Sequence, residues 1–251
     1  MLSRNKFIVF LFVILTCHEQ CYSKIPEYIQ VCKRDQDTVN ECVRDSIEKL
    51  RPKLVEGIPE LNVPSLDPFY IHEIAPPVGS NSRAFQAVGK DIKVSGAGNF
   101  SLKHVEVDLE NLTFRARVRF PRLHFEGKYK VDIQFLLLPI RGEGTLVADA
   151  IKCNVDAFMK IKIVERDGVE YIEFTSIDTD ITIRDYKIKL QGLFNGDKAL
   201  EDATNMALNE NKAELLKAAK PFAEKGVSTI ILDAANKVTK DIPYDELFPK
   251  P

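Results

Sequence analysis

The sequence of 251 residues has no tryptophan and only four histidines, and it lacks the short motifs of several enzyme classes. It contains no Gly-x-Ser-x-Gly elbow, no His-Glu-x-x-His pair and no phosphate-binding glycine loop. The pairs Gly96/Gly98 and Gly142/Gly144 lack the third glycine of a dinucleotide fingerprint and are better explained as bends of a sheet. We therefore expect a protein that is not an enzyme and that needs no metal and no cofactor.

The chain also lacks an excess of charge of either sign. Its 35 basic and 37 acidic residues are spread evenly, so there is no basic stripe for nucleic acid and no acidic tail. Arg115, Arg117 and Arg119 form a basic row on one expected strand. Because no exposed aromatic residues alternate with them, the row is better explained as a solvated face than as an anion site. We expect no nucleic-acid partner.

Long apolar runs are absent except at the N-terminus. Met1–Lys6 is basic, Phe7–Leu15 is apolar, and polar residues follow up to Ser23, which is typical of a secretory signal peptide. Nine apolar residues in a helix span about 14 Å, roughly half of a bilayer core, so a membrane anchor is the weaker alternative. The sequence predicts a signal peptide over residues 1–23 and a secreted, soluble domain over residues 24–251 without a membrane span.

Two of the five cysteines would leave with the signal peptide. Cys32 and Cys42 can close a short loop, and secretion provides the oxidising conditions for a disulfide. Cys153 lies at an apolar position of an alternating pattern, which predicts a buried free thiol; a reactive or intermolecular cysteine is the alternative. In a secreted protein, Asn-x-Ser/Thr triplets are acceptors for N-linked glycans, so Asn99 and Asn111 are predicted glycosylation sites.

The first two thirds of the domain contain one helical pattern and then alternating strands. The helix is expected over Asp35–Glu56, ended by Gly57. Long runs that are apolar on one face follow, and Asp167-Gly168 is a hairpin signal between two of them. The alternation changes phase after Phe174, as a bulge would require, and it shifts again after Ile183. These features predict a long antiparallel meander with one buried face.

The C-terminal part has the composition of a helix. Asp197 can cap its start, and a helical pattern runs over Leu200–Lys240, with a kink expected at Pro221 and a weak point at Gly226. The apolar positions of this stripe are Leu200, Ala203, Ala207, Leu215, Ala219, Phe222, Val227, Ile230, Ile231, Ala234 and Val238. We expect an α+β fold in which a strongly curved antiparallel β-sheet wraps one long C-terminal helix; a separate helical domain is the alternative.

A one-sided sheet around a helix can either pack fully or enclose an apolar lumen. Bulky side chains at inward positions are candidates to line such a space, with plain core packing as the alternative. The predicted ligand-lining residues are Phe114, Phe120, Phe135, Met159, Phe222 and Ile230.

Short motifs along the whole domain resemble the insect takeout and juvenile-hormone-binding proteins. The residues that carry the resemblance are Cys32 and Cys42, Gly57–Leu61, Leu66–Phe69, Pro121, Glu126–Tyr129, Leu136–Gly144, Leu193–Asp197, Leu208–Asn211 and Pro243–Phe248. This resemblance implies a super-roll of sheet around helix, akin to the bactericidal/permeability-increasing proteins, with an internal tunnel for an extended apolar ligand. It also implies a role in circadian, feeding or chemosensory output. The hormone-binding branch has a second disulfide, and Cys153 has no partner, which favours the takeout branch.

We therefore expect a secreted, monomeric carrier of a small hydrophobic ligand such as a terpenoid, fatty acid or isoprenoid. The alternative is a signalling protein of the same fold that a cell-surface receptor recognises without an obligatory ligand. A lipid-modifying enzyme is a third hypothesis, against which the absence of a nucleophile–base pair counts.

Overall fold

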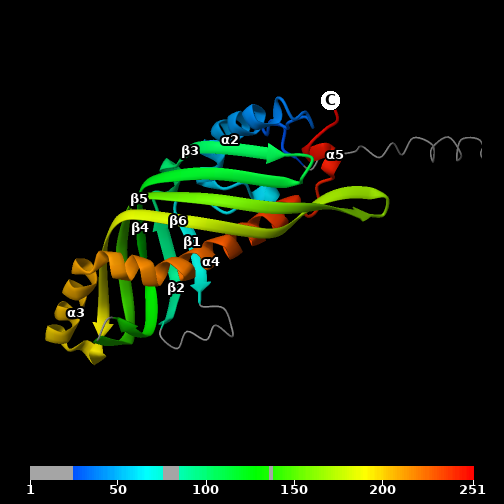
Figure 1. The fold of residues 1–251 in the computed structure, drawn as a ribbon. Helices are drawn as coiled ribbons and strands as arrows, with labels where there is room; N and C mark the ends of the chain where they lie inside the picture. The colour runs from blue at the N-terminus through cyan, green and yellow to red at the C-terminus, as the bar shows by residue number, and fades with distance from the viewer. Residues whose placement is uncertain (1–24, 76–84, 136–137) are drawn as a thin grey trace, which may run out of the picture.

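The computed structural model describes residues 25–75, 85–135 and 138–251, so the predicted signal peptide lies outside the described residues. This part of the chain forms one antiparallel sheet of six strands with helices packed against it (Figure 1). The strands are β1 (Phe69–Ile74), β2 (Phe85–Ser95), β3 (Ser101–Asp108), β4 (Thr113–Phe135), β5 (Leu138–Arg166) and β6 (Val169–Leu193). The helices are α2 (Val39–Glu56), α3 (Lys198–Glu210), α4 (Lys212–Thr239) and α5 (Tyr244–Leu247), with 3-10 turns η1 (Pro59–Leu61), η2 (Ala97–Asn99) and η3 (Phe194–Gly196).

The sheet is built around three very long strands. The order is β1-β2-β4-β5-β6, and β3 pairs with the part of β4 that β2 does not cover. The predicted meander is therefore confirmed in β4, β5 and β6. Asp167 and Gly168 join β5 to β6, and both have positive φ (53° and 78°), as a two-residue hairpin turn of this kind requires.

The three long strands change phase at the same level of the sheet. Pro121 of β4, Lys152 of β5 and Arg184 of β6 lie side by side in one row but are not paired, whereas the residues before and after them on all three strands pair in one unchanged register. Lys152 has a φ of 53°, which turns the backbone locally. The predicted phase change between Ile183 and Tyr186 lies in this row and is confirmed. Because the irregularity crosses the strands together, it bends the whole sheet and produces part of the curvature in Figure 1.

A second irregularity lies near the β5–β6 hairpin. The register shifts between Lys160 and Ile161, so Phe174 pairs with Ile161 while Ile177 pairs with Met159. The phase change predicted after Phe174 is thus confirmed as a bulge, which keeps both Phe174 and Ile177 on the same side of the sheet.

The C-terminal helix runs along β6, and the sheet curves around it (Figure 1). The expected single helix is in fact two, α3 and α4, which are divided at Asn211 (φ −99°, ψ 57°). The Asn211 side-chain amide donates to the carbonyl of Ala207 and so satisfies the end of α3. Pro221 lies inside α4 at an exposed position, where water can satisfy the carbonyl that a proline leaves without a partner.

The N-terminal helix is shorter than expected. It begins at Val39, because Asp35 accepts hydrogen bonds from the Thr38 hydroxyl and the Asp37 amide and holds residues 35–38 in a turn. The helix ends as predicted at Gly57 (φ 97°). No helix in the described part of the chain is both long and apolar enough to cross a membrane.

Tightly packed side chains gather at the two ends of the molecule. The cluster near α3 consists of Tyr129, Ile133, Phe135, Ile140, Leu190, Leu193 and Leu208. The cluster under α2 consists of Cys32, Val39, Val105 and Val107. Between these two clusters the inner face of the sheet meets α4.

Candidate ligand-binding site

One hydrogen-bonded row shows which face of the sheet is turned toward α4. Thr179 on β6 donates its hydroxyl to the Glu224 carbonyl (3.0 Å) and lies 3.0 Å from the Ser228 hydroxyl oxygen, both on α4. Thr179 pairs with Ala157, which in turn pairs with Ala116. Side chains in this row and two residues to either side therefore face the helix, and the intervening charged side chains face solvent.

The inner face beside this row is apolar but only half-buried. The inward residues that pair across β4, β5 and β6 are Phe114–Met159–Ile177, Val118–Val155–Ile181 and Phe120–Cys153–Ile183. Of these, only Cys153 and Ile177 are buried. A packed protein interior would bury nearly all of them.

The apolar surface of helix α4 is also only half-buried. Its buried residues are Ser228 and Thr239, whereas its large apolar side chains, including Phe222 and Ile230, are half-buried. Apolar surfaces on the helix and on the sheet thus face each other without complete packing. This stretch between the two packed clusters is the candidate site for an apolar ligand.

The structure brings most of the predicted lining residues to this stretch. Phe114 and Met159 are direct partners on neighbouring strands, and Phe120 faces inward at the bend, opposite Cys153. Phe114 also packs against the cluster under α2, which places it at one end of the stretch. Phe135 does not join them: it is the last residue of β4 and is buried in the cluster near α3.

Sequence reasoning did not single out the small and β-branched residues between the aromatic ones. Val118, Val155 and Ile181 lie in one inward row in the middle of the stretch. The signal that could have found them is the alternation that identified Phe114 and Phe120. They were missed because only bulky side chains were considered as candidates to line the space.

Cys153 is a free thiol on the inner face, as predicted. Its side chain is buried, and this burial raises the pKa of the thiol to about 11. At neutral pH the sulfur is therefore a protonated, unreactive group, and it contributes to the site as a small apolar surface.

Two buried tyrosines close the end near α3. Tyr129 donates its hydroxyl to the Gln191 carbonyl (3.1 Å), and Tyr186 donates to the Leu208 carbonyl. Burial raises the pKa of each to about 12, so both phenols stay protonated and keep these bonds. Apolar packing and satisfied polar groups together seal this end.

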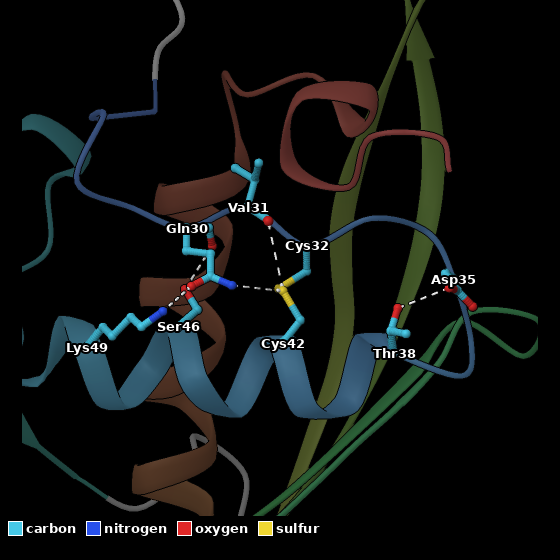
Figure 2. The surroundings of a disulfide bond; sticks show 8 residues. All are labelled: Gln30, Val31, Cys32, Asp35, Thr38, Cys42, Ser46 and Lys49. Carbon is cyan, nitrogen blue, oxygen red and sulfur yellow. Dashed lines mark hydrogen bonds between the residues drawn. A yellow bond between two sulfur atoms is a disulfide. The ribbon is translucent and has the colours of Figure 1, made fainter.

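The opposite end is fixed by the disulfide between Cys32 and Cys42, which joins the N-terminal segment to α2 (Figure 2). Next to it the Ser46 hydroxyl donates to the Gln30 carbonyl (2.8 Å), and Lys49 donates to the Gln30 side chain. The predicted pairing of the cysteines is present, and it ties the segment before α2 to the helix.

The outer face of the sheet carries a charged hollow of about 680 Å³. There Arg117 is paired with Asp156, and the Arg115 guanidinium lies over the Phe158 ring and 4.0 Å from Glu106. Two of the three arginines of the basic row, Arg115 and Arg117, thus have acidic neighbours, and Arg119 is exposed, in agreement with a solvated face. Among the described residues no cluster of His, Cys, Asp and Glu could hold a metal ion.

The two predicted glycosylation sites lie on the surface. Asn99 is exposed in η2, and Asn111 is exposed in the turn between β3 and β4. Both are accessible, and their modification stays a prediction.

Known proteins share this architecture and sequence. The family model described as "Haemolymph juvenile hormone binding protein" matches residues 9–249. The circadian clock-controlled protein daywake of Drosophila melanogaster is 26% identical over 244 residues, covering 94% of this chain and 93% of its own. A putative beta-carotene-binding protein of Schistocerca gregaria is 24% identical over 209 residues, covering 82% of each chain.

A solved structure has the same fold. The crystal structure of Epiphyas postvittana Takeout 1 superposes with a TM-score of 0.72 at 21% sequence identity, covering 88% of this chain and 99% of Takeout 1. The predicted fold, a curved antiparallel sheet around C-terminal helices, is therefore confirmed. The family match spans nearly the whole described chain. The chain belongs to the haemolymph juvenile hormone binding protein family.

Proposed function

We propose that this protein is a secreted carrier that binds a small, extended, lipophilic ligand between its sheet and α4. The observation that carries the proposal is the half-buried apolar surface between two packed ends. The names of the family and of one relative support it, since the family is named for binding juvenile hormone and the relative for binding beta-carotene.

The chemistry of the stretch favours a ligand that is mostly hydrocarbon. Its walls come from valine, isoleucine, phenylalanine and methionine, and its polar pair, Thr179 and Ser228, is already hydrogen-bonded. A terpenoid, an isoprenoid or a fatty acid fits such walls. Apolar walls distinguish neighbouring hydrocarbons by only about 1–3 kcal/mol per methylene, so we propose the class of ligand and not one compound.

Two neighbouring substitutions on β4 test the site. Val118 faces α4 and Arg119 faces solvent, so Val118→Trp fills the proposed space while Arg119→Trp adds the same side chain outside it. Native mass spectrometry of the purified protein with added retinol or palmitic acid should show binding to the wild type and Arg119→Trp, and a loss of binding in Val118→Trp.

Equal binding by both variants would place the ligand elsewhere. If no hydrophobe binds to the wild type, the carrier function is wrong. Capture of the empty protein by a cell-surface receptor would then favour the signalling alternative.

Secretion is the second part of the proposal. It is supported by the signal-like N-terminus, by the disulfide and by the haemolymph location in the family's name. Expression of the full chain in insect cells should yield a protein in the medium that begins at Lys24. A product retained in the cells with its N-terminus intact would contradict this.

A further inference from the structure

Strand β6 forms an edge of the described sheet, and α3 bonds to this edge through side chains. Side chains spaced four residues apart on α3 bond to the backbone of alternate residues of β6. The pairs are Glu201 with the Gly192 amide, Asn205 with the amide and carbonyl of Leu190, and Asn209 with the amide and carbonyl of Ile188. Four residues of helix rise about 6 Å and two residues of strand about 6.6 Å, so the two repeats match.

Helix α4 is attached to β6 in the same way at Glu224 and Asn236. Asn236 accepts from the Phe174 amide and donates to its carbonyl, at 2.8 and 3.0 Å. Glu224 accepts from the Ile181 amide at 2.9 Å. These amide and carboxylate clamps replace the hydrogen bonds that another strand would make to the edge.

Residues 212–220 of α4, which lie between the hydrogen bonds of Asn209 and of Glu224, are held to β6 differently. Along residues 212–220 of α4, the described structure shows two ion pairs to β6, Lys212 with Asp185 and Lys220 with Asp180, and the Lys212 ammonium also lies 5.8 Å from the centre of the Tyr186 ring. The four side chains are 42–66% exposed. Exposed ion pairs are weak and are screened by salt, and opening them lets water solvate both partners.

This weakly held segment lies beside the apolar interior. Asp185 is next to the row where the sheet bends, and Ile183 on the same strand faces inward in the row of Phe120. On the helix side, Leu215 and Leu216 are half-buried, and Leu215 packs against the cluster near α3, so the segment is held by apolar contact at its first turn and by the ion pairs. Separation of α4 from β6 here would connect solvent with the candidate site without breaking an amide clamp.

We propose that the ligand enters and leaves through the seam between residues 182–187 of β6 and residues 212–220 of α4. The Lys212–Asp185 and Lys220–Asp180 ion pairs hold this seam closed. The hydrogen bonds of Asn209 on α3 and of Glu224 on α4 fix the helices to β6 on either side of it. This inference rests on the proposed carrier function and adds the route of exchange.

Release kinetics test whether these ion pairs hold the seam closed. The protein is loaded with the fluorescent probe N-phenyl-1-naphthylamine and mixed with excess phosphatidylcholine vesicles at low and high salt. Asp180→Asn/Asp185→Asn removes both ion pairs but keeps an oxygen that can accept from the Tyr186 amide, as Asp185 does now. We expect its release rate at low salt to rise about three- to tenfold, and the acceleration of the wild type by salt to disappear in the variant.

The matched control is Asp233→Asn. Its ion pair with Lys237 is similarly exposed but lies within α4 and does not cross the seam. This variant should release the probe as the wild type does and keep the salt dependence. Equal release rates for the wild type and the double variant would overturn the proposal.

A covalent bridge tests the same seam in the opposite direction. In Asp180→Cys/Lys220→Cys, a short bismaleimide can join the two new thiols, because Cys32 and Cys42 are already bonded and Cys153 is buried. Bridging should slow release at least about tenfold relative to the unbridged variant. Unchanged release from the bridged protein would place the route elsewhere. A wild type that binds no probe would instead contradict the carrier function itself.

Discussion

Glu201 shows how one carboxylate joins α3 to the sheet. Its side chain is 3% exposed, and it accepts a 2.7 Å hydrogen bond from the amide of Gly192, whose φ of 91° suits glycine. Lys198 donates to the other carboxylate oxygen at 3.2 Å. The Gly192 amide, followed by the Lys198 ammonium, lowers the pKa of Glu201 below its ordinary value.

This shift predicts a pH-dependent contribution to stability. A lowered pKa in the folded state means that the stabilisation is complete above the ordinary glutamate pKa, about 4.3, and is lost as the pH falls through the lower folded pKa. Glu201→Gln should therefore lower Tm at pH 7, and the difference from the wild type should shrink below about pH 4. Thermal unfolding monitored by circular dichroism between pH 3 and pH 7 measures this.

The control is Glu210→Gln, which changes an exposed carboxylate at the end of the same helix. It should leave Tm nearly unchanged at every pH. If the Tm difference between Glu201→Gln and the wild type is the same from pH 3 to pH 7, the negative charge of Glu201 does not contribute to stability.

At the scale of elements, the first two turns of α3 have the reverse of the expected polarity, whereas Leu208 near its end is buried in the cluster near α3. The apolar stripe predicted Leu200 and Ala203 to face the interior, but Leu200 is 51% exposed and Ala203 is exposed. Glu201 and Thr204 are buried instead. That part of the prediction was wrong because the free edge of β6 requires polar partners, and a pattern within one helix does not show what lies beside it.

Asn209 provides a measurable case of this edge bonding. It bonds to both the amide and the carbonyl of Ile188, so Asn209→Ala would leave two backbone groups without their partners. We expect a loss of about 1–3 kcal/mol in the free energy of unfolding. Asn209→Asp keeps an acceptor for the amide but turns a carboxylate oxygen toward the Ile188 and Asn205 carbonyls, so it should not recover the stability lost in Asn209→Ala. Urea unfolding measures both, with Glu210→Ala as the control on the exposed side; equal stabilities would mean that water replaces the clamp.

The features that sequence analysis predicted correctly depend on residues close together in the chain. The turn at Asp167-Gly168 and the phase changes after Phe174 and Ile183 follow from local backbone rules and side-chain alternation. The break at Asn211 was missed, because Pro221 was the stronger signal within the helix pattern. Whether Pro221 interrupts the helix depends on its exposure to water, and exposure is a property of the folded chain that a local pattern does not show.

At the scale of the whole molecule, curvature decides which inward residues share a space. Phe120 and Phe135 occupy equivalent inward positions on β4, yet Phe135 is packed near α3 while Phe120 faces the open stretch at the bend. Alternation predicts the face of each residue and cannot show how a strand of this length curves. The sequence could therefore predict which residues lie on the inner face of the sheet, but not which of them lie together around one ligand space.

Phe222 connects this architecture with ligand choice. It lies on α4 after Pro221 and is half-buried, in a helix whose apolar side is not fully packed. Truncation of a fully buried phenylalanine costs about 3–5 kcal/mol, so Phe222→Ala should cost less than this in the protein without ligand. If Phe222 lines the ligand space, the variant should also prefer longer or bulkier ligands, because the space beside it is enlarged.

Urea unfolding and competition binding of fatty acids from lauric to arachidic acid measure the two effects on one preparation. Lys217→Ala, on the exposed side of the same helix, is the control and should change neither quantity. A shift of the preferred chain length in Phe222→Ala alone would place this side chain against the ligand. A stability loss as large as that of a fully buried phenylalanine, with an unchanged order of binding, would show that Phe222 packs only against protein and that the ligand lies further along the sheet.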